Sequence, residues 1–401
     1  MDTNTSALLS RLSESATIAM SRKAGELKAS GRDIISLSLG EPDFDTPDVI
    51  KAAACDAIEN NYTHYMPVPG YVEVREAICK KFERDNGLVY TPEQIVISTG
   101  AKQSLMNAVL ALVDDQDEVV VASPYWVSYA DMVRLSGATL VDIKTGIDSD
   151  FKMTADQLRA ALTPRTRLVF LNSPCNPSGS VYSRRELEAL AAVIAEHDRA
   201  LVISDEIYEY IQFGEPHVSF AGIPGMMERT VTVNGVSKGF AMTGWRIGYI
   251  GAPQWIAAAC TKLQGQFTSG TCGISQKAAQ AAVEHGAPIV EQMRLEFGKR
   301  RELIIDWLGA VQGFRVNRPS GAFYVFPDVS GLFGSTHAGG RIDSGQDLAM
   351  YLLEDAGVAT VGGDAFGSPA CLRLSYAASE GVLREAVERI GASVARLNPP
   401  Q

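Results

Sequence analysis

Several side chains that could do chemistry follow short apolar runs of the sequence and could form one binding site. They are Trp126, Asn176, Asp205, Tyr208, Ser237, Lys238 and Arg246. A lysine whose pKa is lowered by its surroundings can form a Schiff base with an aldehyde, and a carboxylate can hold a pyridine nitrogen protonated so that the ring accepts electrons. A hydroxyl and a guanidinium can bind a phosphate, and an indole offers a flat face to a ring. Together these residue types fit a phosphorylated, aromatic cofactor that carries a carbonyl group.

Taken singly, each of these residues has an ordinary structural explanation. An aspartate at a strand end, such as Asp205, is more often a helix N-cap, and a lone tryptophan or lysine is usually a core, rim or solvated residue. The segment Gly100-Ala101-Lys102 adds small residues at the predicted start of a helix, where free N–H groups and the helix dipole attract a phosphate. The combination favours a ligand site over the separate explanations.

The elements that must position these residues read as the strands of one sheet. The predicted strands are the continuous apolar or β-branched runs 95–98, 119–122, 168–171, 201–204, 230–233 and 247–250. Continuous runs without alternation are typical of strands that helices cover on both faces. Between two of them, Ser183 and Glu186 have the spacing of a capping box, which predicts the start of a helix. We therefore expect an α/β fold with a mostly parallel sheet, in which ligands bind at the carboxyl ends of the strands.

The chain is long enough for two or three domains, and two regions rich in glycine and proline suggest where they divide. One is Gly40-Glu41-Pro42-Asp43 and the other is Gly286-Ala287-Pro288. Beyond the second, the sequence predicts a charged helix over 291–307, a strand over 323–326 and a final helix near 380–396. We expect residues 46–288 to form a large cofactor-binding domain, and residues 1–45 plus 289–401 to form one smaller α/β domain.

The composition excludes several classes of function. With 401 residues, 46% of them hydrophobic and 21% charged, the chain has the composition of an ordinary globular protein. Its 36 basic and 47 acidic residues give a net charge of −11, which argues against nucleic acid or an anionic membrane as the main partner. No apolar run reaches the length of a membrane span, and the polar N-terminus lacks the pattern of a signal peptide.

Cysteine and histidine usage narrows the chemistry further. The six cysteines form no Cys-x-x-Cys pair, which indicates free thiols in a reducing cytoplasm, where we expect the protein to reside. The five histidines show no His-Glu-x-x-His spacing, and the sequence has neither a Gly-x-x-x-x-Gly-Lys phosphate loop nor a dinucleotide-binding fingerprint. We therefore expect no metal, and neither ATP nor nicotinamide chemistry has support.

Six ordered motifs give the sequence a family resemblance. They are GEPDFDTP from Gly40, PYWVSY from Pro124, NPSG from Asn176, DEIYE from Asp205, SKGFAMTGWRIGY from Ser237 and GAFYVFPD from Gly321. In order and spacing they resemble the class I aminotransferases that depend on pyridoxal 5′-phosphate (PLP), over essentially the whole chain. The resemblance is strongest to the bacterial aspartate aminotransferase branch, whose members sometimes also use prephenate. It implies PLP as the cofactor and the PLP-dependent fold type I.

The resemblance implies a role for each residue that matches a family motif. Lys238 would form the Schiff base with PLP and move the proton between the substrate Cα and the C4′ carbon of the cofactor. Asp205 would pair with the pyridine nitrogen, Tyr208 and Asn176 with the phenolate oxygen of the ring, and Trp126 would stack on the ring. The phosphate would be bound by Gly100, Ala101, Ser237, Arg246 and, from the neighbouring subunit, Tyr65. The active unit would then be a homodimer whose active sites are shared between subunits.

The same resemblance implies a substrate site made of Gly40, Thr17, Lys102, Trp126, Asn176 and Arg373. Arg373 would bind the substrate α-carboxylate as a bidentate fork, and Gly40 would place a backbone group at the same carboxylate. Lys102 would meet a distal carboxylate, although a solvated lysine at a helix N-terminus is the alternative explanation. We therefore expect transamination between L-aspartate and a 2-oxo acid, 2-oxoglutarate, giving oxaloacetate and an amino acid.

Three alternatives stay open at this point. The nearest is an aminotransferase that prefers prephenate or aromatic and neutral amino acids. Relatives that accept prephenate tend to carry a basic residue at the position of Ser13 and proline at that of Glu14, and Arg11 is offset, which lowers the expectation of prephenate activity. Leu39, where relatives often have alanine, would narrow or reshape the pocket. A PLP-dependent lyase would break a different bond, and a non-catalytic binding module would usually carry an added DNA-binding domain.

Overall fold

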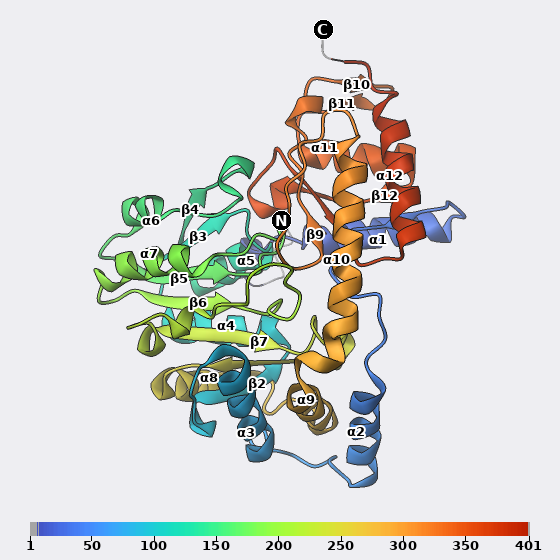
Figure 1. Ribbon diagram of the computed structural model, residues 1–401. Coiled ribbons are helices and arrows are strands. Elements are labelled where there is room, and N and C mark those ends of the chain that lie inside the picture. The colour runs from blue at the N-terminus through green and yellow to red at the C-terminus, as the bar shows by residue number, and fades with distance from the viewer. Residues whose placement is uncertain (1–5, 7, 400–401) are drawn as a thin grey trace.

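Seven strands form one sheet at the centre of the larger group of elements (Figure 1). They are β2 (Ile95–Thr99), β3 (Glu118–Ser123), β4 (Thr139–Lys144), β5 (Thr166–Asn172), β6 (Leu201–Asp205), β7 (Thr230–Gly235) and β8 (Ile247–Gly251). Their order across the sheet is β2-β8-β7-β6-β5-β3-β4. Within this sheet β8 runs against its neighbours β2 and β7, and the remaining pairs are parallel. The prediction of a mostly parallel sheet is confirmed.

Helices bury the sheet on both faces, as the alternate residues of a central strand show by packing against different helices. The covering helices are α4 (Ala101–Leu112), α5 (Ser128–Ser136), α6 (Ala155–Ala161), α7 (Arg184–Ala195) and α8 (Gln254–Phe267). In β3, Val119 and Val121 pack with α4, α5 and α8, whereas Val120 packs with α6 and α7. Burial on both faces explains why these strands read as continuous apolar runs.

Local sequence signals account for most element boundaries in this region. The predicted capping box is present at α7, where the N–H of Ser183 donates to the Glu186 carboxylate at 2.7 Å and the N–H of Glu186 donates to Ser183 Oγ at 3.3 Å. All six predicted strands exist. The sequence predictions lack β4, an edge strand whose residues are mostly half-buried or exposed and include Asp142, so it has no continuous apolar run.

The N-terminal and C-terminal parts of the chain lie together beside the large sheet (Figure 1). β1 (Ile35–Ser36) pairs in parallel with β12 (Val358–Ala359). A second sheet, antiparallel, contains β9 (Tyr324–Val325), β13 (Val361–Gly362) and β14 (Leu372–Ser375) in the order β13-β14-β9. The surrounding helices are α1 (Ala16–Ala29), α10 (Ala287–Gly309), α11 (Gly345–Tyr351) and α12 (Glu380–Val394). The β1–β12 pairing accords with joining residues 1–45 to 289–401, and the exact division at 45 and 288 stays a prediction.

The remaining α-helices and strands of the described residues are α2 (Asp48–Glu59), α3 (Val72–Lys81), α9 (Gly273–His285) and the hairpin of β10 (Thr336–His337) and β11 (Gly340–Arg341). The structure, a computed structural model, describes Ser6 and residues 8–399. Within that part of the chain, no helix combines the length and apolar character needed to cross a membrane.

Candidate active site

The predicted residues meet in one cavity of about 240 Å³ at the carboxyl edge of the large sheet. Those that line it are Thr17, Gly40, Ala101, Lys102, Trp126, Asn176, Asp205, Tyr208, Ser237, Lys238, Arg246 and Arg373. Arg246 reaches this edge because β8 is antiparallel, so the residue before β8 lies beside the carboxyl ends of the other strands. Gly100 directly precedes Ala101. Tyr65 does not line the cavity and its side chain is fully exposed, so the role predicted for it needs a second subunit.

Lys238 follows β7, and its Nζ donates to the backbone oxygen of Gly40, in the segment after β1, at 2.5 Å. Burial lowers the pKa of Lys238 to about 8; the nearby cations Arg373 and Arg246 add to the decrease, and Glu41 opposes it. An amine with this pKa is partly neutral near neutral pH. That is the form required to attack a carbonyl or to act as a general base.

Asp205 ends β6 and is 4% exposed. Its Oδ2 accepts a hydrogen bond from the Tyr129 hydroxyl at 2.7 Å, and its Oδ1 accepts one from the N–H of Ile207 at 3.2 Å. Burial raises the pKa of Asp205 to about 6, although both hydrogen bonds act in the opposite direction. The carboxylate is therefore desolvated and suited to a cationic partner.

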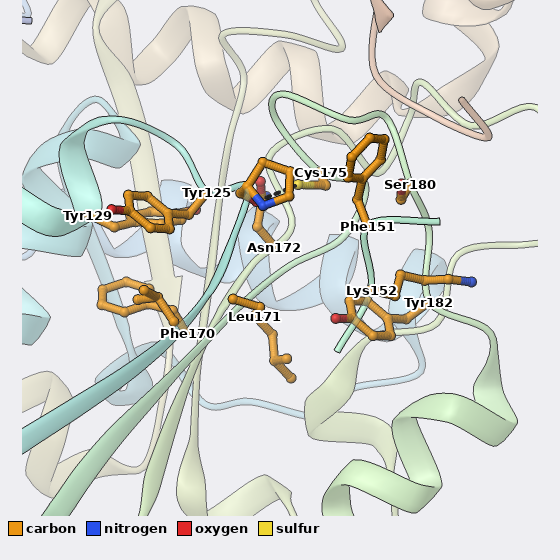
Figure 2. Close-up of a pocket in the computed structure, with 13 residues that line it drawn as sticks. Tyr125, Tyr129, Phe151, Lys152, Phe170, Leu171, Asn172, Cys175, Ser180 and Tyr182 are labelled. Atoms are coloured by element: carbon orange, nitrogen blue, oxygen red, sulfur yellow. Dashed lines mark hydrogen bonds between the residues drawn. The ribbon is translucent and has the colours of Figure 1, made fainter. Parts of the chain in front are cut away.

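Aromatic packing fixes the position of the Tyr129 hydroxyl. The Tyr129 ring stacks on Phe170 with 4.5 Å between centroids and meets the Trp126 ring edge-on at 5.5 Å. Figure 2 shows Tyr129 above Phe170 at one side of a second, smaller cavity of about 30 Å³, which shares Tyr129 and Asn172 with the main one. The smaller cavity has room for about one or two water molecules, so it is no second ligand site.

One end of the main cavity is built to bind an anion. α4 begins there at Ala101, and the first N–H groups of a helix have no acceptor within the helix. Gly100 has φ +81°, and a Cβ at this position would lie 2.3 Å from Arg246 Nη2, so the guanidinium packs directly on the glycine. Arg246 itself has φ 57°, an uncommon left-handed conformation. Ser237, which is buried, lines the same cavity. These donors agree with the predicted phosphate site.

Arg373 in β14 is a buried cation, 1% exposed. Its Nη1 donates to Asn176 Oδ1 at 2.9 Å and its Nη2 to the backbone oxygen of Ser38 at 2.6 Å, while Nε is buried without a hydrogen-bond partner. Within residues 8–399, no acidic side chain forms an ion pair with it. Burial lowers the pKa of Arg373, and its guanidinium lies against the rings of Tyr324 and Phe366. An anionic ligand would supply the missing partner.

Tyr208 and Gly40 are connected through Tyr324 of β9. The hydroxyl groups of Tyr208 and Tyr324 lie 2.8 Å apart, and a Cβ at Gly40 would lie 2.1 Å from the Tyr324 hydroxyl oxygen. Gly40 is thus required for close approach of the segment after β1 to the cavity. Burial raises the pKa of Tyr208, so its hydroxyl keeps its proton and can donate a hydrogen bond.

Lys102 lies against Trp126, with its Nζ 5.0 Å from the centroid of the Trp126 ring. Burial and the neighbouring Arg246 charge lower the pKa of Lys102. Of the residues that the structure describes, no carboxylate forms an ion pair with Lys102. Thr17 lies in the same wall, with its Oγ1 2.9 Å from Ser15 Oγ, and Ile18 and Leu39 complete it.

Three residues that line the cavity, Tyr129, Asn172 and Tyr324, have no role in the predictions from the sequence. Tyr129 stands three positions after Trp126, which is helical spacing, so a helix starting near Trp126 places both on one face. Asn172 ends β5 as Asp205 ends β6, and its Nδ2 donates to the Asp205 backbone oxygen at 2.9 Å. These two signals could have been found in the sequence, whereas the contact of Tyr324 with Tyr208 joins positions 116 residues apart.

The donor set fits a phosphorylated pyridine aldehyde. Anion donors stand at one end of the cavity (Gly100, Ala101, Ser237, Arg246), Asp205 stands as a desolvated carboxylate with a raised pKa, and Lys238 supplies an amine with a lowered pKa. The indole of Trp126 and the phenol of Tyr208 complete the wall. Neither Asp205 nor Arg246 forms an ion pair with another of the described residues, and a ring nitrogen cation and a phosphate would supply the opposite charges.

Comparison with known proteins identifies the family. The family model described as aminotransferase class I and II matches residues 32–390. The chain is 48% identical to an aspartate/prephenate aminotransferase of Cereibacter sphaeroides, over 97% of this chain and 98% of that protein. It is 47% identical to a bifunctional aspartate aminotransferase and glutamate/aspartate-prephenate aminotransferase of Petunia hybrida, over 100% of this chain and 85% of that protein.

A solved structure gives the same result for the fold. The crystal structure of the aspartate aminotransferase from Rhizobium meliloti superposes with a TM-score of 0.95 and 42% sequence identity, covering 98% of this chain and 100% of that one. The prediction of the PLP-dependent fold is confirmed by this superposition and by the family match over most of the chain. This protein belongs to the class I and II aminotransferase family.

Proposed function

We propose that the protein is an aspartate aminotransferase, which transfers the amino group of L-aspartate to 2-oxoglutarate and releases oxaloacetate and an amino acid. The observation that carries the proposal is Arg373, a buried guanidinium that faces the cavity with an unpartnered Nε and without an acidic partner in the described chain. A substrate α-carboxylate would supply the missing anion as a bidentate partner. Lys102, a second unpaired cation of the same cavity, would receive the distal carboxylate of a dicarboxylic substrate.

The cofactor of this family, PLP, supplies when bound an aldehyde and an electron-accepting ring. Lys238 Nζ, whose pKa burial lowers to about 8, takes the proton from the substrate Cα as a general base and later returns a proton as a general acid. The Asp205 carboxylate holds the proton on the ring nitrogen. Asn176 orients Arg373 through its Oδ1, so the substrate Cα is presented to Lys238 in one geometry.

The proposed role of Lys102 is tested by Lys102→Ala. The apparent KM for aspartate is expected to rise about 10-fold or more, because a charge-assisted contact contributes about 1.5–3 kcal/mol. The KM for an apolar amino acid should change little, which serves as the internal control. Equal changes for both substrates would show that Lys102 does not bind the distal carboxylate.

The proposed reaction is tested directly by spectroscopy and kinetics of the purified enzyme. The yellow holoenzyme should change its absorbance when aspartate is added and change back with 2-oxoglutarate. Because the two half-reactions share one site, initial-rate lines against one substrate at fixed levels of the other should be parallel. Intersecting lines would contradict the mechanism.

Prephenate is a second candidate acceptor, because two relatives at 47–48% identity carry names that include prephenate. In this chain Arg11 does not line the cavity and lies beside Gly137, and Glu14 forms an ion pair with Arg22. A panel with one amino donor and a range of 2-oxo acids, including prephenate, decides between the two acceptors. A PLP-dependent lyase or a non-catalytic module has no support from the relatives, which are named as aminotransferases.

The proposed active unit is a homodimer in which Tyr65 completes the phosphate site of the partner subunit. Its side chain is fully exposed in the single chain, which is unusual for a tyrosine and agrees with burial against a second copy. Sedimentation should give a dimer, and Tyr65→Phe should weaken PLP binding. All six cysteines are free, which supports a reducing compartment, the cytoplasm.

A further inference from the structure

A group of charged and polar side chains, most of them buried, lies next to Asp205 and Tyr208 in the sequence or is bonded to their neighbours, but does not line the cavity. We refer to it as the rear network, and it consists of Lys81, Asn86, Ser204, Glu206, Glu209, His217 and Ser219. The side chains of Lys81, Glu206 and Glu209 are 0%, 1% and 3% exposed. None of the reactions proposed above uses these groups.

Most polar atoms of the rear network are paired within it, although His217 Nδ1 is buried without a hydrogen-bond partner. Lys81 forms an ion pair with Glu209 and donates to Asn86 Oδ1 at 2.7 Å. Asn86 Nδ2 donates to Glu209 Oε2 and to Ser219 Oγ, both at 2.8 Å. The Ser219 hydroxyl donates a hydrogen bond to Glu206 Oε2 at 2.6 Å. One continuous set of hydrogen bonds therefore joins the two carboxylates.

Glu206 has a full set of donors as well. Its Oε2 lies 2.9 Å from His217 Nε2, and its Oε1 accepts from Ser204 Oγ at 2.7 Å and from the N–H of Phe220 at 3.2 Å. Glu206, Glu209 and His217 together offer three ligand atoms close enough for a metal ion. However, the Lys81 ammonium already compensates Glu209 and both Glu206 oxygens are taken, so the cluster is not a metal site.

At two places a residue that lines the cavity directly precedes a member of the rear network in the sequence. Asp205 and Tyr208 line the cavity, whereas the next residue in each case, Glu206 and Glu209, belongs to the rear network. Successive side chains at the end of a strand point to opposite sides, and the Glu206 N–H still donates to the Val233 backbone oxygen of β7 at 2.9 Å. The turn is closed by the Glu209 N–H, which donates to the Glu206 backbone oxygen at 3.0 Å. Each cofactor-facing side chain is thus anchored from behind by its neighbour.

Stability alone does not explain why charges are buried here. Replacing a buried ion pair by apolar residues of similar size is often neutral or stabilising, whereas a polar network can fix one geometry. Catalytic groups must be held within a few tenths of an ångström of their productive positions by supporting hydrogen bonds. The rear network supplies such support to the short segment that carries both Asp205 and Tyr208.

We propose that the rear network is a positioning device for the cofactor, in which the Lys81–Glu209 ion pair and the Glu206–His217 contact hold Asp205 and Tyr208 in register with PLP. The inference rests on PLP being bound in the cavity as described above. It assigns Lys81, Glu206, Glu209 and His217 as positioning residues, which act through Asp205 and Tyr208 and touch neither PLP nor substrate.

The test is a double-mutant cycle on the Lys81–Glu209 pair, with PLP affinity as the readout. Glu209→Gln and Lys81→Met each leave one buried charge unpaired and should raise the dissociation constant of PLP by about 10-fold. This is the lower end of the loss in affinity when a residue that orients a ligand-binding side chain is removed, as known from metal sites. The double variant Lys81→Met/Glu209→Gln removes both charges and should recover most of the affinity. The pH at which the absorbance of bound PLP changes should move in the single variants and return toward wild type in the double variant.

Glu118→Gln is the matched control. Glu118 is a buried carboxylate at the amino end of β3 that accepts from Thr163 Oγ1 at 2.6 Å and pairs with Arg165, so its loss should lower the melting temperature and leave PLP affinity unchanged. If the Lys81 and Glu209 variants behave like this control, the rear network only stabilises the fold and the proposal is wrong. If the single variants do not fold, Asn86→Ala, which cuts the link between the two carboxylates, must raise the PLP dissociation constant several-fold, and an unchanged constant overturns the proposal. Failure of the wild-type protein to bind PLP would instead refute the proposed function.

Discussion

Asp205→Asn is expected to stabilise the cofactor-free protein in a way that depends on pH. Burial raises the pKa of Asp205 to about 6 from an ordinary value of 3.8, so the folded carboxyl holds its proton more tightly than the unfolded one. The protonated form contributes stability that is fully present below the unfolded pKa and is lost as the pH rises through about 6. At 1.36 kcal/mol per pKa unit, ionisation of this buried group costs the folded state about 3 kcal/mol.

Asparagine has nearly the same size, can still accept from the Tyr129 hydroxyl and cannot ionise. The difference in unfolding free energy between Asp205→Asn and wild type should therefore grow with pH, and about 2 kcal/mol of the growth falls between pH 4.5 and 7.5. Denaturant unfolding of the apoprotein at a series of pH values measures it. Comparing differences along the pH series removes the constant effect of the substitution on packing.

Asp48→Asn provides a control with the opposite sign. Asp48 is exposed, and its hydrogen bond with Lys51 lowers the pKa of its carboxyl, so it stabilises the fold above its unfolded pKa and this small contribution is lost as the pH falls. Loading the wild type with PLP should remove the pH dependence at Asp205, since the ring nitrogen cation compensates the carboxylate. A difference between Asp205→Asn and wild type that stays constant with pH, or falls as pH rises, would refute the assignment of Asp205 as an uncompensated buried acid.

Two further substitutions separate cofactor binding from substrate binding. Gly100→Ala places a Cβ 2.3 Å from Arg246 Nη2 at a φ of +81°, so the guanidinium must move. In a reconstitution titration the PLP dissociation constant should rise about 10-fold, which is equivalent to about 1.4 kcal/mol. The KM for aspartate should change little. Arg373→Lys keeps the charge but loses the guanidinium fork. The value of kcat/KM for aspartate should therefore fall about 100-fold, as expected for loss of about 3 kcal/mol of charge-assisted hydrogen bonding. The affinity for PLP should stay unchanged. An altered PLP affinity in Arg373→Lys, or an unaltered one in Gly100→Ala, would contradict these assignments.

The large sheet was predictable because two-sided burial leaves a direct mark on the sequence. The six strands predicted for this sheet are continuous apolar or β-branched runs, and a central one, β3, packs against helices on both faces. The capping box at Ser183 marks the start of α7. The edge strand β4 leaves no such mark, since its side chains are only partly buried. The composition of β8 likewise does not indicate the direction of this strand, although Arg246 reaches the cavity only because β8 is antiparallel to its neighbours.

Several cavity residues could be grouped from the sequence because they lie within a few positions of a strand end, whereas Thr17, Gly40, Lys102 and Arg373 were assigned through the family resemblance. A residue that ends a parallel strand is delivered to the ligand-binding edge by the fold itself, as for Asp205 after β6. The rear network has no comparable signal. Lys81 and Glu209 are 128 positions apart, and Lys81 is the last residue of an otherwise ordinary helix. A lysine within the mostly charged run from Lys80 to Asp85 would be expected to face solvent. Only the packed chain shows that this lysine is fully buried.

The contrast between two neighbouring groups of buried charges separates binding from support. In the rear network, each charge has its counter-charge within the chain, as Lys81 has Glu209. In the cavity, Asp205, Lys238 and Arg373 each have a pKa that burial moves against the charged form, and the described chain provides no ion-pair partner for Arg373. These desolvated charges cost folding free energy, which a ligand with opposite charges would offset. A zwitterionic ring that carries a phosphate, joined by a carboxylate substrate, has the required signs, so the electrostatics of the site agree with the family match.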